Sequence, residues 1–583
     1  MTRRAPLHQA APARDDGRFA LGLTLAWLGI VGAIALGWHE PWRDEAQAWM
    51  LARDSATLAA LAHNARYEGH PLLWHLVLFA AARLSRSNLV LPLVHLLVAG
   101  TTAYVVARWA PFTRRLRTVL VFGYFLAYEY AVVARSYALG AALLVVTCAL
   151  LSGAASSERE ARRRGWIIAA TLGLLPFANA FALVLAIVLA VVLLVEAVLG
   201  RRPIEATRTG WSRPLPWLAA LPPRVALRAA VGIAAVVTAS AVAATRQIVP
   251  PSDASFTVGH DVAPGRSPLR HLIVGSWGVH AAYAPVPDLA AADFTWQSNL
   301  IAGTLARADL PIGPRALVHS TATGLLLLGA ALMFRRARVR AALLLWLVGT
   351  GAYAYVLGGV FWGGVRHQGH LYLVLFAATW LAAATVRGGP PAHVIAASTP
   401  VADTPALGTA HARPFRFFTV VAWLQLGCAL ILLVADAILP FSGARGAAAI
   451  LRARGVASWP IVGARRDMLA ALAAQLDRPI WFVEEGGART FVAWGDVRAR
   501  THPDAVAARY AESRPTVALR VALERLAASN GQLLLILDTP LPPPTPPSGI
   551  DVRLLGRARG MLVREESYWL YALCRGRCPS PSR

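Results

Sequence analysis

Residues 184–200 read VLAIVLAVVLLVEAVLG, an apolar run that contains a single acid. A run of this length matches a helix cut to the thickness of the hydrocarbon core of a bilayer. Similar runs recur along the chain of 583 residues, which is 56% hydrophobic and only 15% charged. Apolar runs separated by arginine-rich breaks predict a mainly α-helical, polytopic membrane protein.

This pattern predicts about eleven transmembrane helices. They lie at roughly 19–37, 89–107, 118–134, 137–153, 166–182, 184–200, 229–245, 317–334, 341–360, 369–386 and 417–438. The segment 71–88 is either a further span or a helix that lies at the membrane interface. Its charge and its flanks favour the interface.

The arginines indicate the orientation in the membrane. The basic residues are all arginine and give the chain a net charge of +26. They flank apolar runs, whereas a nucleic-acid-binding protein gathers them on a soluble face, so we exclude nucleic acid as a partner. With the N-terminus inside and 71–88 at the interface, every strong basic cluster between spans falls on the cytoplasmic side. These clusters are Arg3, Arg4, Arg14 and Arg18; Arg108, Arg114, Arg115 and Arg117; Arg159, Arg162, Arg163 and Arg164; Arg201, Arg202, Arg208 and Arg213; and Arg335, Arg336, Arg338 and Arg340.

This orientation divides the chain into two predicted domains. Residues 1–438 form a transmembrane domain with an outer loop at 38–88 and a long outer loop at 246–316. Residues 439–583 have the composition of a soluble α/β domain, placed outside the membrane. Its candidate helices are 446–454, 467–476, 503–512 and 516–529, and its candidate strands are 479–485, 532–538 and 568–574.

Two cysteines close a short turn near the C-terminus. Cys574 and Cys578 flank the sequence RGR. An extracytoplasmic location permits a disulfide between them. The alternative is two free thiols, because so small a loop can strain the bond.

The first outer loop carries the richest set of polar groups. Asp44 and Glu45 follow the first span, and Glu68 and His70 follow an amphipathic stretch. Asp44 is a candidate general base for an acceptor hydroxyl, and Glu45 is a candidate ligand of a divalent cation. The competing interpretation is that both acids only stabilise the start of the helix that follows.

Two further segments place arginine on the outer side, against the topological bias. Arg135 and Tyr137 lie between two apolar runs, and Arg366 and His367 lie in a late turn. Arginine suits a phosphate because its planar fork donates two hydrogen bonds. The alternative is an interfacial arginine that pairs with Glu129. Two histidines, at 367 and 370, are too few to predict a zinc site.

Two of these motifs resemble a known family. Trp42-Arg43-Asp44-Glu45-Ala46, followed by Glu68-Gly69-His70-Pro71-Leu72, resembles the first outer loop of C-type (GT-C) glycosyltransferases. The likeness is to the branch of protein O-mannosyltransferases and aminoarabinose transferases (glycosyltransferase family 39-like). Arg135-Ser136-Tyr137 is similar to the arginine element of the second outer loop, and Arg366-His367 looks like a later element that binds the donor phosphate. Some relatives have an acid in the second outer loop, where this chain offers Glu129.

The resemblance implies a GT-C-like transmembrane domain that works on the outer face of the plasma (inner) membrane. Its donor would be a polyprenyl-phosphate sugar, and its acceptor a hydroxyl of a lipid, a glycan or a protein. Asp44 would be the base, with Arg135 and Arg366 on the leaving phosphate. No cofactor is certain, and a divalent cation is one option. A lipid transporter or flippase without covalent chemistry is the main alternative, and an assembly protein that works through its C-terminal domain is another.

Overall fold

The computed structural model describes residues 14–153, 155, 157–199, 214–251, 267–289, 296–308, 311–387, 413–495, 514–542 and 548–579. Eight helices in this part of the chain are long and apolar enough to cross a membrane, so the protein is a polytopic membrane protein. They are α1 (Arg14–Ala33) with its π-helical continuation η1 (Ile34–Trp38), α5 (Val90–Trp109), α9 (Ala180–Leu199), α11 (Pro223–Ile248), α15 (Ile312–Ala337), α16 (Arg340–Gly359), α17 (Val365–Arg387) and α18 (Arg416–Ile438).

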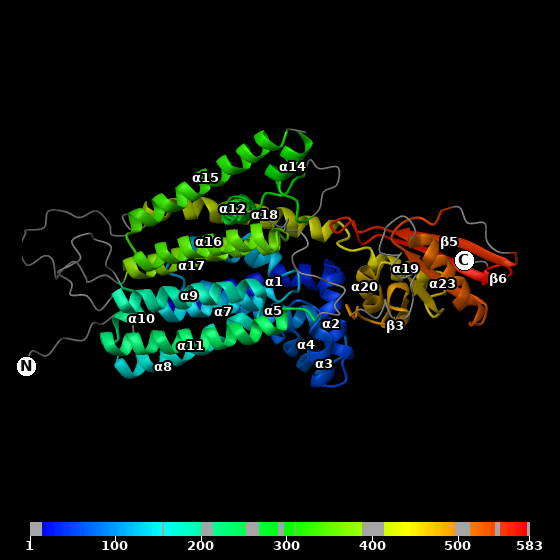
Figure 1. Ribbon diagram of the computed structural model, residues 1–583, viewed down its shortest axis with the longest axis horizontal. Helices are drawn as coiled ribbons and strands as arrows, with labels where there is room; N and C mark the ends of the chain where they lie inside the picture. Colours follow the sequence, from blue (N-terminus) through cyan, green and yellow to red (C-terminus); the bar gives the residue numbers. More distant parts are fainter. Residues whose placement is uncertain are drawn as a thin grey trace, which may run out of the picture.

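Two shorter helices, α7 (Tyr137–Ser152) and α8 (Glu158–Leu174), run alongside the long ones, and Figure 1 shows the bundle that they form together. The prediction of one continuous helix at 118–134 is wrong. The chain forms α6 (Arg114–Val121) and then the π-helical turn η2 (Phe125–Glu129). Between them, Gly123 packs so closely on Gln425 that an added Cβ would lie 3.3 Å from the glutamine Cβ. Apolar periodicity does not reveal such a close approach.

Three short helices gather at one end of the bundle, next to the C-terminal sheet (Figure 1). They are α2 (Arg43–Asp54), α3 (Leu58–Ala65) and α4 (Leu73–Leu84). With 12 residues, α4 is too short to cross a hydrocarbon core of about 30 Å. This length agrees with the prediction that 71–88 lies at the interface.

The segment predicted as a long outer loop is more than a connecting loop. It contains α12 (Pro268–Ser276), α13 (Gly278–Tyr283) and α14 (Leu300–Arg307). Gly275 of α12 meets the backbone of α16 at Ala354 and Gly358, where a Cβ would not fit. The Tyr283 hydroxyl accepts a hydrogen bond from Trp346 Nε1 at 3.1 Å within the bundle. The segment therefore packs inside the helical bundle. Its small residues allow the helices to approach each other closely.

The C-terminal region forms a six-stranded mixed sheet in the order β3-β2-β1-β4-β6-β5. The strands β1, β2 and β4 are parallel, and β3, β5 and β6 pair antiparallel. The predicted strands appear as β2 (Ile480–Phe482), β4 (Gln532–Leu537) and β6 (Tyr568–Arg575), and the sequence missed β1 (Ile461–Gly463), β3 (Gly487–Arg489) and β5 (Ile550–Ala558). The helices are α19 (Ala444–Ala453), α20 (Arg466–Leu476) and α23 (Arg514–Ala527). The candidate helix at 503–512 lies outside the described residues.

The remaining short elements are η3 (Leu175–Phe177), α10 (Pro216–Ala219), η7 (Arg413–Phe415) and η8 (Val483–Glu485). The predicted disulfide between Cys574 and Cys578 is confirmed, and it closes the end of β6. The other two cysteines, Cys148 and Cys428, are free and buried in α7 and α18.

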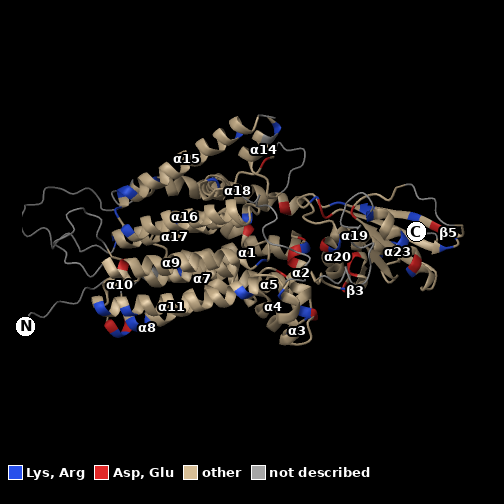
Figure 2. Cartoon of the chain, in the orientation of Figure 1, with Lys and Arg blue, Asp and Glu red and all other residues tan. Residues whose placement is uncertain are grey.

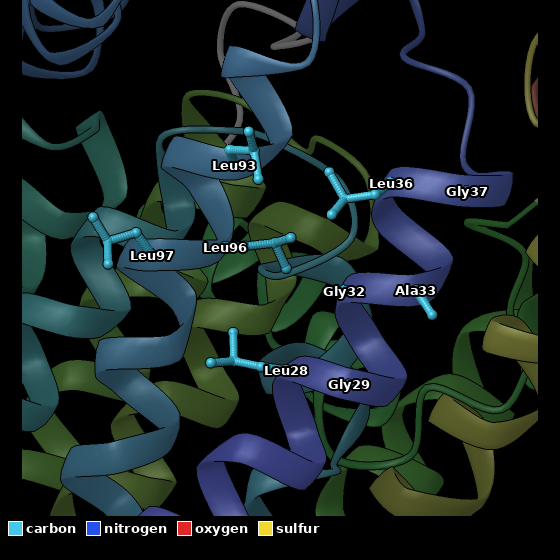
Figure 3. A pocket seen from close by; sticks show the side chains of 9 residues that line it. All are labelled: Leu28, Gly29, Gly32, Ala33, Leu36, Gly37, Leu93, Leu96 and Leu97. Atoms are coloured by element: carbon cyan, nitrogen blue, oxygen red, sulfur yellow. The ribbon is translucent and has the colours of Figure 1, made fainter.

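Charged residues and apolar surface occupy different parts of the bundle. Figure 2 shows charged residues gathered at its two ends, with few between them. The basic starts of α8 and α16 and the basic end of α15 lie away from the C-terminal sheet (Figure 1). Along the side, α1 and α5 leave a groove of about 640 Å³ (Figure 3). It is lined by leucines and by Gly29, Gly32 and Gly37, so it suits contact with lipid hydrocarbon.

Candidate functional site

A cavity of about 420 Å³ lies where the first loop, the ends of several helices and the C-terminal domain meet. Its wall takes residues from α2, from the loop before α4, from the starts of α7, α9 and α17, and from the end of α16. All the predicted site residues except Glu45 line this cavity. They are Asp44, Glu68, His70, Arg135, Tyr137, Arg366 and His367.

Asp44 is held between two arginines that are distant from it in the sequence. It sits in the first turn of α2, and its Oδ2 lies 3.3 Å from Arg135 Nη1 and 3.1 Å from Arg366 Nη2. Arg135 Nη1 also donates to the backbone oxygen of Asp44 at 2.7 Å. Local stabilisation of the helix start does not account for partners that come from α17 and from the segment before α7. The cavity therefore contains a three-membered charge cluster.

The charge cluster controls the protonation of Asp44. Burial acts to raise the pKa of its carboxyl, but Arg135, Arg366 and Arg43 outweigh burial and lower that pKa below its usual value. A carboxyl with a lowered pKa is ionised at neutral pH, and an ionised carboxylate is the form that accepts a proton.

Several buried donors in the cavity have no hydrogen-bond partner among the described residues. They are Nε and Nη1 of Arg366, the hydroxyl of Tyr137 and Nδ2 of Asn179. Buried polar groups are nearly always paired in folded proteins, so a set of unpaired donors in one cavity indicates a ligand. Donors that include a guanidinium indicate an anionic ligand.

Glu68 and His70 form the neighbouring wall. Gln47 Nε2 donates to Glu68 Oε1 at 2.7 Å. Burial raises the pKa of Glu68 to about 7. Burial and the charge of Arg135 lower the pKa of His70 to about 3, so its ring is neutral and Nε2 faces Arg135 Nη2 at 3.4 Å.

Glu45 does not line the cavity, and its carboxylate is engaged by protein donors. Its Oε2 accepts from the backbone N–H of Trp42 at 3.1 Å, and its Oε1 accepts from that of Ala134 at 2.5 Å. The first bond caps the start of α2, as the competing interpretation of the sequence held. In the part of the chain that the structure describes, no group of three or more His, Cys, Asp or Glu side chains is arranged to hold a metal ion. Glu45, the candidate cation ligand, therefore has both carboxylate oxygens engaged and does not reach the cavity.

Beneath Glu45, a buried histidine bridges two acids. His39 Nε2 lies 3.0 Å from Glu45 Oε2, and His39 Nδ1 lies 2.7 Å from Asp436 Oδ2 at the end of α18. Burial alone would lower the pKa of His39, but Asp436 and Glu45 outweigh it and raise this pKa to about 10. The protonated ring therefore ties the start of α2 to the helical bundle.

This bridge predicts a pH dependence of stability. A raised pKa in the folded state contributes stability that is fully present below about pH 6.5 and is lost as the pH rises through about 10. We expect the thermal midpoint of the detergent-solubilised protein to fall between these values. The variant His39→Asn should be less stable at pH 6.5 and should show a flatter profile up to pH 10. Parallel profiles for the two proteins would show that His39 is not protonated in the fold.

The sequence missed several residues that line the cavity. Arg43 sits beside Asp44, and its Nη1 donates to Asp467 Oδ2 of α20 at 3.0 Å. Trp494 also comes from the C-terminal domain. Asn179 had a signal, because it is a polar residue at a bend between two apolar runs, but Asp467 and Trp494 had none.

Solved structures that are similar to this chain include two of one protein. ArnT from Cupriavidus metallidurans in the apo state is 14% identical, with a TM-score of 0.49 over 94% of this chain and 97% of that chain. The same protein bound to undecaprenyl phosphate is 14% identical, with a TM-score of 0.47 over 95% of this chain and 97% of that chain. No protein-family model and no curated protein sequence matches this chain. At 14% identity, neither structure identifies the substrates of this protein.

Proposed function

We propose that this chain is a membrane glycosyltransferase. It transfers a sugar from a polyprenyl-phosphate donor to a hydroxyl of a lipid, a glycan or a protein. The observation that carries the proposal is the cavity in which Arg135 and Arg366 converge on Asp44, with the other donors of Arg366 unpaired. The two arginines can bind the donor phosphate, and the carboxylate can accept the proton of the acceptor hydroxyl.

In the resting site, Asp44 takes the place of the phosphate. Both arginines contact the same carboxylate oxygen, Oδ2. A phosphodiester that enters the cavity competes for these arginines and weakens their hold on Asp44. Because the arginines keep the pKa of Asp44 low, their withdrawal makes its carboxylate a stronger base. Donor binding thus prepares the base.

The reaction then exchanges one C–O bond for another. The acceptor oxygen attacks the anomeric carbon while its proton passes to Asp44. The bond between the anomeric carbon and the phosphate oxygen breaks, and polyprenyl phosphate leaves with the electron pair. Attack opposite the leaving group inverts the anomeric configuration. Arg135 and Arg366 stabilise the charge that develops on the phosphate, and this electrostatic effect is commonly the largest in such reactions.

The cavity lies at the end of the bundle where the C-terminal domain sits, and we place this end outside the plasma membrane. The basic starts of α8 and α16 at the opposite end support a cytoplasmic location for that end and for the N-terminus. The first loop, 38–88, is then the catalytic outer loop. Residues 1–438 form the transmembrane domain, and residues 439–583 form the extracytoplasmic domain.

Cysteine labelling tests this orientation. Ala56 is exposed beside α3 and Arg163 is exposed in α8, while the native free cysteines are buried. We expect Ala56→Cys to react with a membrane-impermeant maleimide in intact cells, and Arg163→Cys to react only after permeabilisation. Labelling of both positions from one side would contradict the placement of the cavity outside.

The transferase is tested with purified protein and a panel of polyprenyl-phosphate sugars. We expect release of polyprenyl phosphate from at least one donor. Mass spectrometry of the lipid fraction measures this release. A transporter or flippase moves the same lipid across a proteoliposome membrane and leaves its glycosidic bond intact. Transport without cleavage of any donor in the panel would overturn the proposal.

A further inference from the structure

A second cavity, of about 680 Å³, shares a turn with the site cavity. Phe361, Arg366 and His367 line the site cavity, whereas the residues between Phe361 and Arg366 and the side chain of Gln368 line the second one. Its other walls come from α13, α14 and α15 and from the segments that join them. The two cavities are therefore lined by the same segment, residues 361–368.

Two amide side chains line this second cavity. Nε2 of Gln297 is buried and has no partner among the described residues. Gln368 is 5% exposed and lines the same cavity. A buried amide nitrogen that lacks a partner is costly, so it indicates a ligand that accepts a hydrogen bond.

The charged groups in the second cavity are neutralised within it. Arg307 donates to both carboxylate oxygens of Asp288, with Nη2 at 3.0 Å from Oδ1. His280 Nε2 lies 2.9 Å from His319 Nδ1, so one ring must donate and the other must accept. At least one of the two rings is therefore neutral. Such a lining favours an uncharged ligand over a phosphate, in contrast with the arginines around Asp44.

Aromatic rings supply the apolar part of the lining. Trp277 stacks on His319 with ring centroids 5.0 Å apart and an interplanar angle of 19°. Trp362 lines the cavity from the shared turn and is 37% exposed. Indole rings offer flat apolar faces, which pack on the C–H faces of a sugar ring while its hydroxyls reach polar side chains.

We propose that the second cavity is a binding site for an uncharged saccharide. The amides of Gln297 and Gln368 hydrogen-bond its hydroxyls, and Trp277 and Trp362 pack against its ring. Asp288 and Arg307 are engaged with each other, so the proposed sugar is bound there and is not transferred. This inference is independent of the transferase activity, because the lining would bind a sugar whether or not Asp44 acts as a base.

Binding is tested on the full chain in lipid nanodiscs. The probes are the methyl glycosides of D-mannose, D-glucose and D-arabinose at millimolar concentration. Their binding is measured by saturation-transfer difference NMR. We expect at least one glycoside to give a signal that saturates with concentration. Loss of the hydrogen bonds of one amide should weaken its affinity about tenfold in Gln297→Leu and in Gln368→Leu. Neither substitution removes a hydrogen bond among the described residues, so the thermal midpoint should change little.

Matched controls locate the bound glycoside. Gln475→Leu makes the same chemical change on α20, outside both cavities, and should leave binding unchanged. Asp44→Asn alters the site cavity alone and should also leave glycoside binding unchanged. If a glutamine variant does not fold, Trp362→Ala replaces it, because that side chain is partly exposed. The proposal is overturned if no glycoside gives a saturable signal, or if the signal persists in the cavity variants and disappears in Asp44→Asn.

Discussion

Asp44→Asn should reduce sugar transfer by at least about 100-fold, because a positioned base contributes roughly 10²–10⁴-fold to such a reaction. Asparagine has the size of aspartate but cannot take up a proton. It also ceases to compete with the donor phosphate for Arg135 and Arg366. We therefore expect kcat to fall while the affinity for polyprenyl phosphate stays the same or rises. Single-turnover transfer and a lipid-binding titration measure the two effects separately.

Two controls accompany this variant. Asp16→Asn makes the same change at an aspartate that pairs with Arg114 and lines neither cavity, and it should leave transfer unchanged. Glu45→Gln should act mainly on stability, because Glu45 caps α2 and contacts His39. Transfer near the wild-type rate in Asp44→Asn would mean that Asp44 only balances the charge of the arginines. The base would then have to be Glu68, which lines the same cavity.

Arg366→Lys should reduce transfer by about 30- to 1000-fold, the equivalent of roughly 2–4 kcal/mol of transition-state stabilisation. Lysine keeps the charge but loses the planar fork, which places Nη2 on Asp44 while Nε and Nη1 remain unpaired. The same change at Arg135 should have a similar effect, and it should also cost stability, because Arg135 holds the backbone of Asp44.

Arg162→Lys is the matched control for the arginine variants, because Arg162 forms an exposed pair with Glu158 at the far end of the bundle. Initial rates at saturating donor and at limiting donor separate an effect on kcat from an effect on donor binding. Full activity in Arg366→Lys would show that this arginine anchors the interface and does not hold the phosphate.

The candidate site was largely predictable, because its residues break local rules. Arg135 and Arg366 stand out as arginines at the end of the bundle opposite the basic clusters, and Asp44 follows a span directly. The sequence did not indicate that Arg135 and Arg366, which lie 231 positions apart by number, contact one carboxylate oxygen, since such a contact depends on helix packing. The sequence assigned Asp44 as the base and Glu45 as a cation ligand, but it did not indicate that Asp44 alone lines the cavity while Glu45 is engaged by backbone donors.

The fold was predictable where hydrophobicity alone decides it. Long apolar helices such as α9 follow from their runs of residues. The sequence failed at α12 and α13, whose short apolar stretches resemble a loop until α16 and α17 cover them. It also missed the strands β1 and β3, which have three residues each and depend on neighbouring strands for their hydrogen bonds.

The C-terminal domain is fastened to the helix that carries Asp44. Arg43 reaches Asp467, Gln47 exchanges two hydrogen bonds with the backbone of Val492, and Arg53 donates to Asp477 at 2.7 Å. A truncation after position 438 would leave these buried or half-buried groups of α2 without partners, and unpaired groups of that kind are costly. The shortened chain would lose the C-terminal domain and also the contacts that hold Asp44 in position. Loss of activity on truncation would therefore not show whether the C-terminal domain recognises the acceptor or only holds α2 in place. Point substitutions at the contact between the domain and α2 separate these two roles.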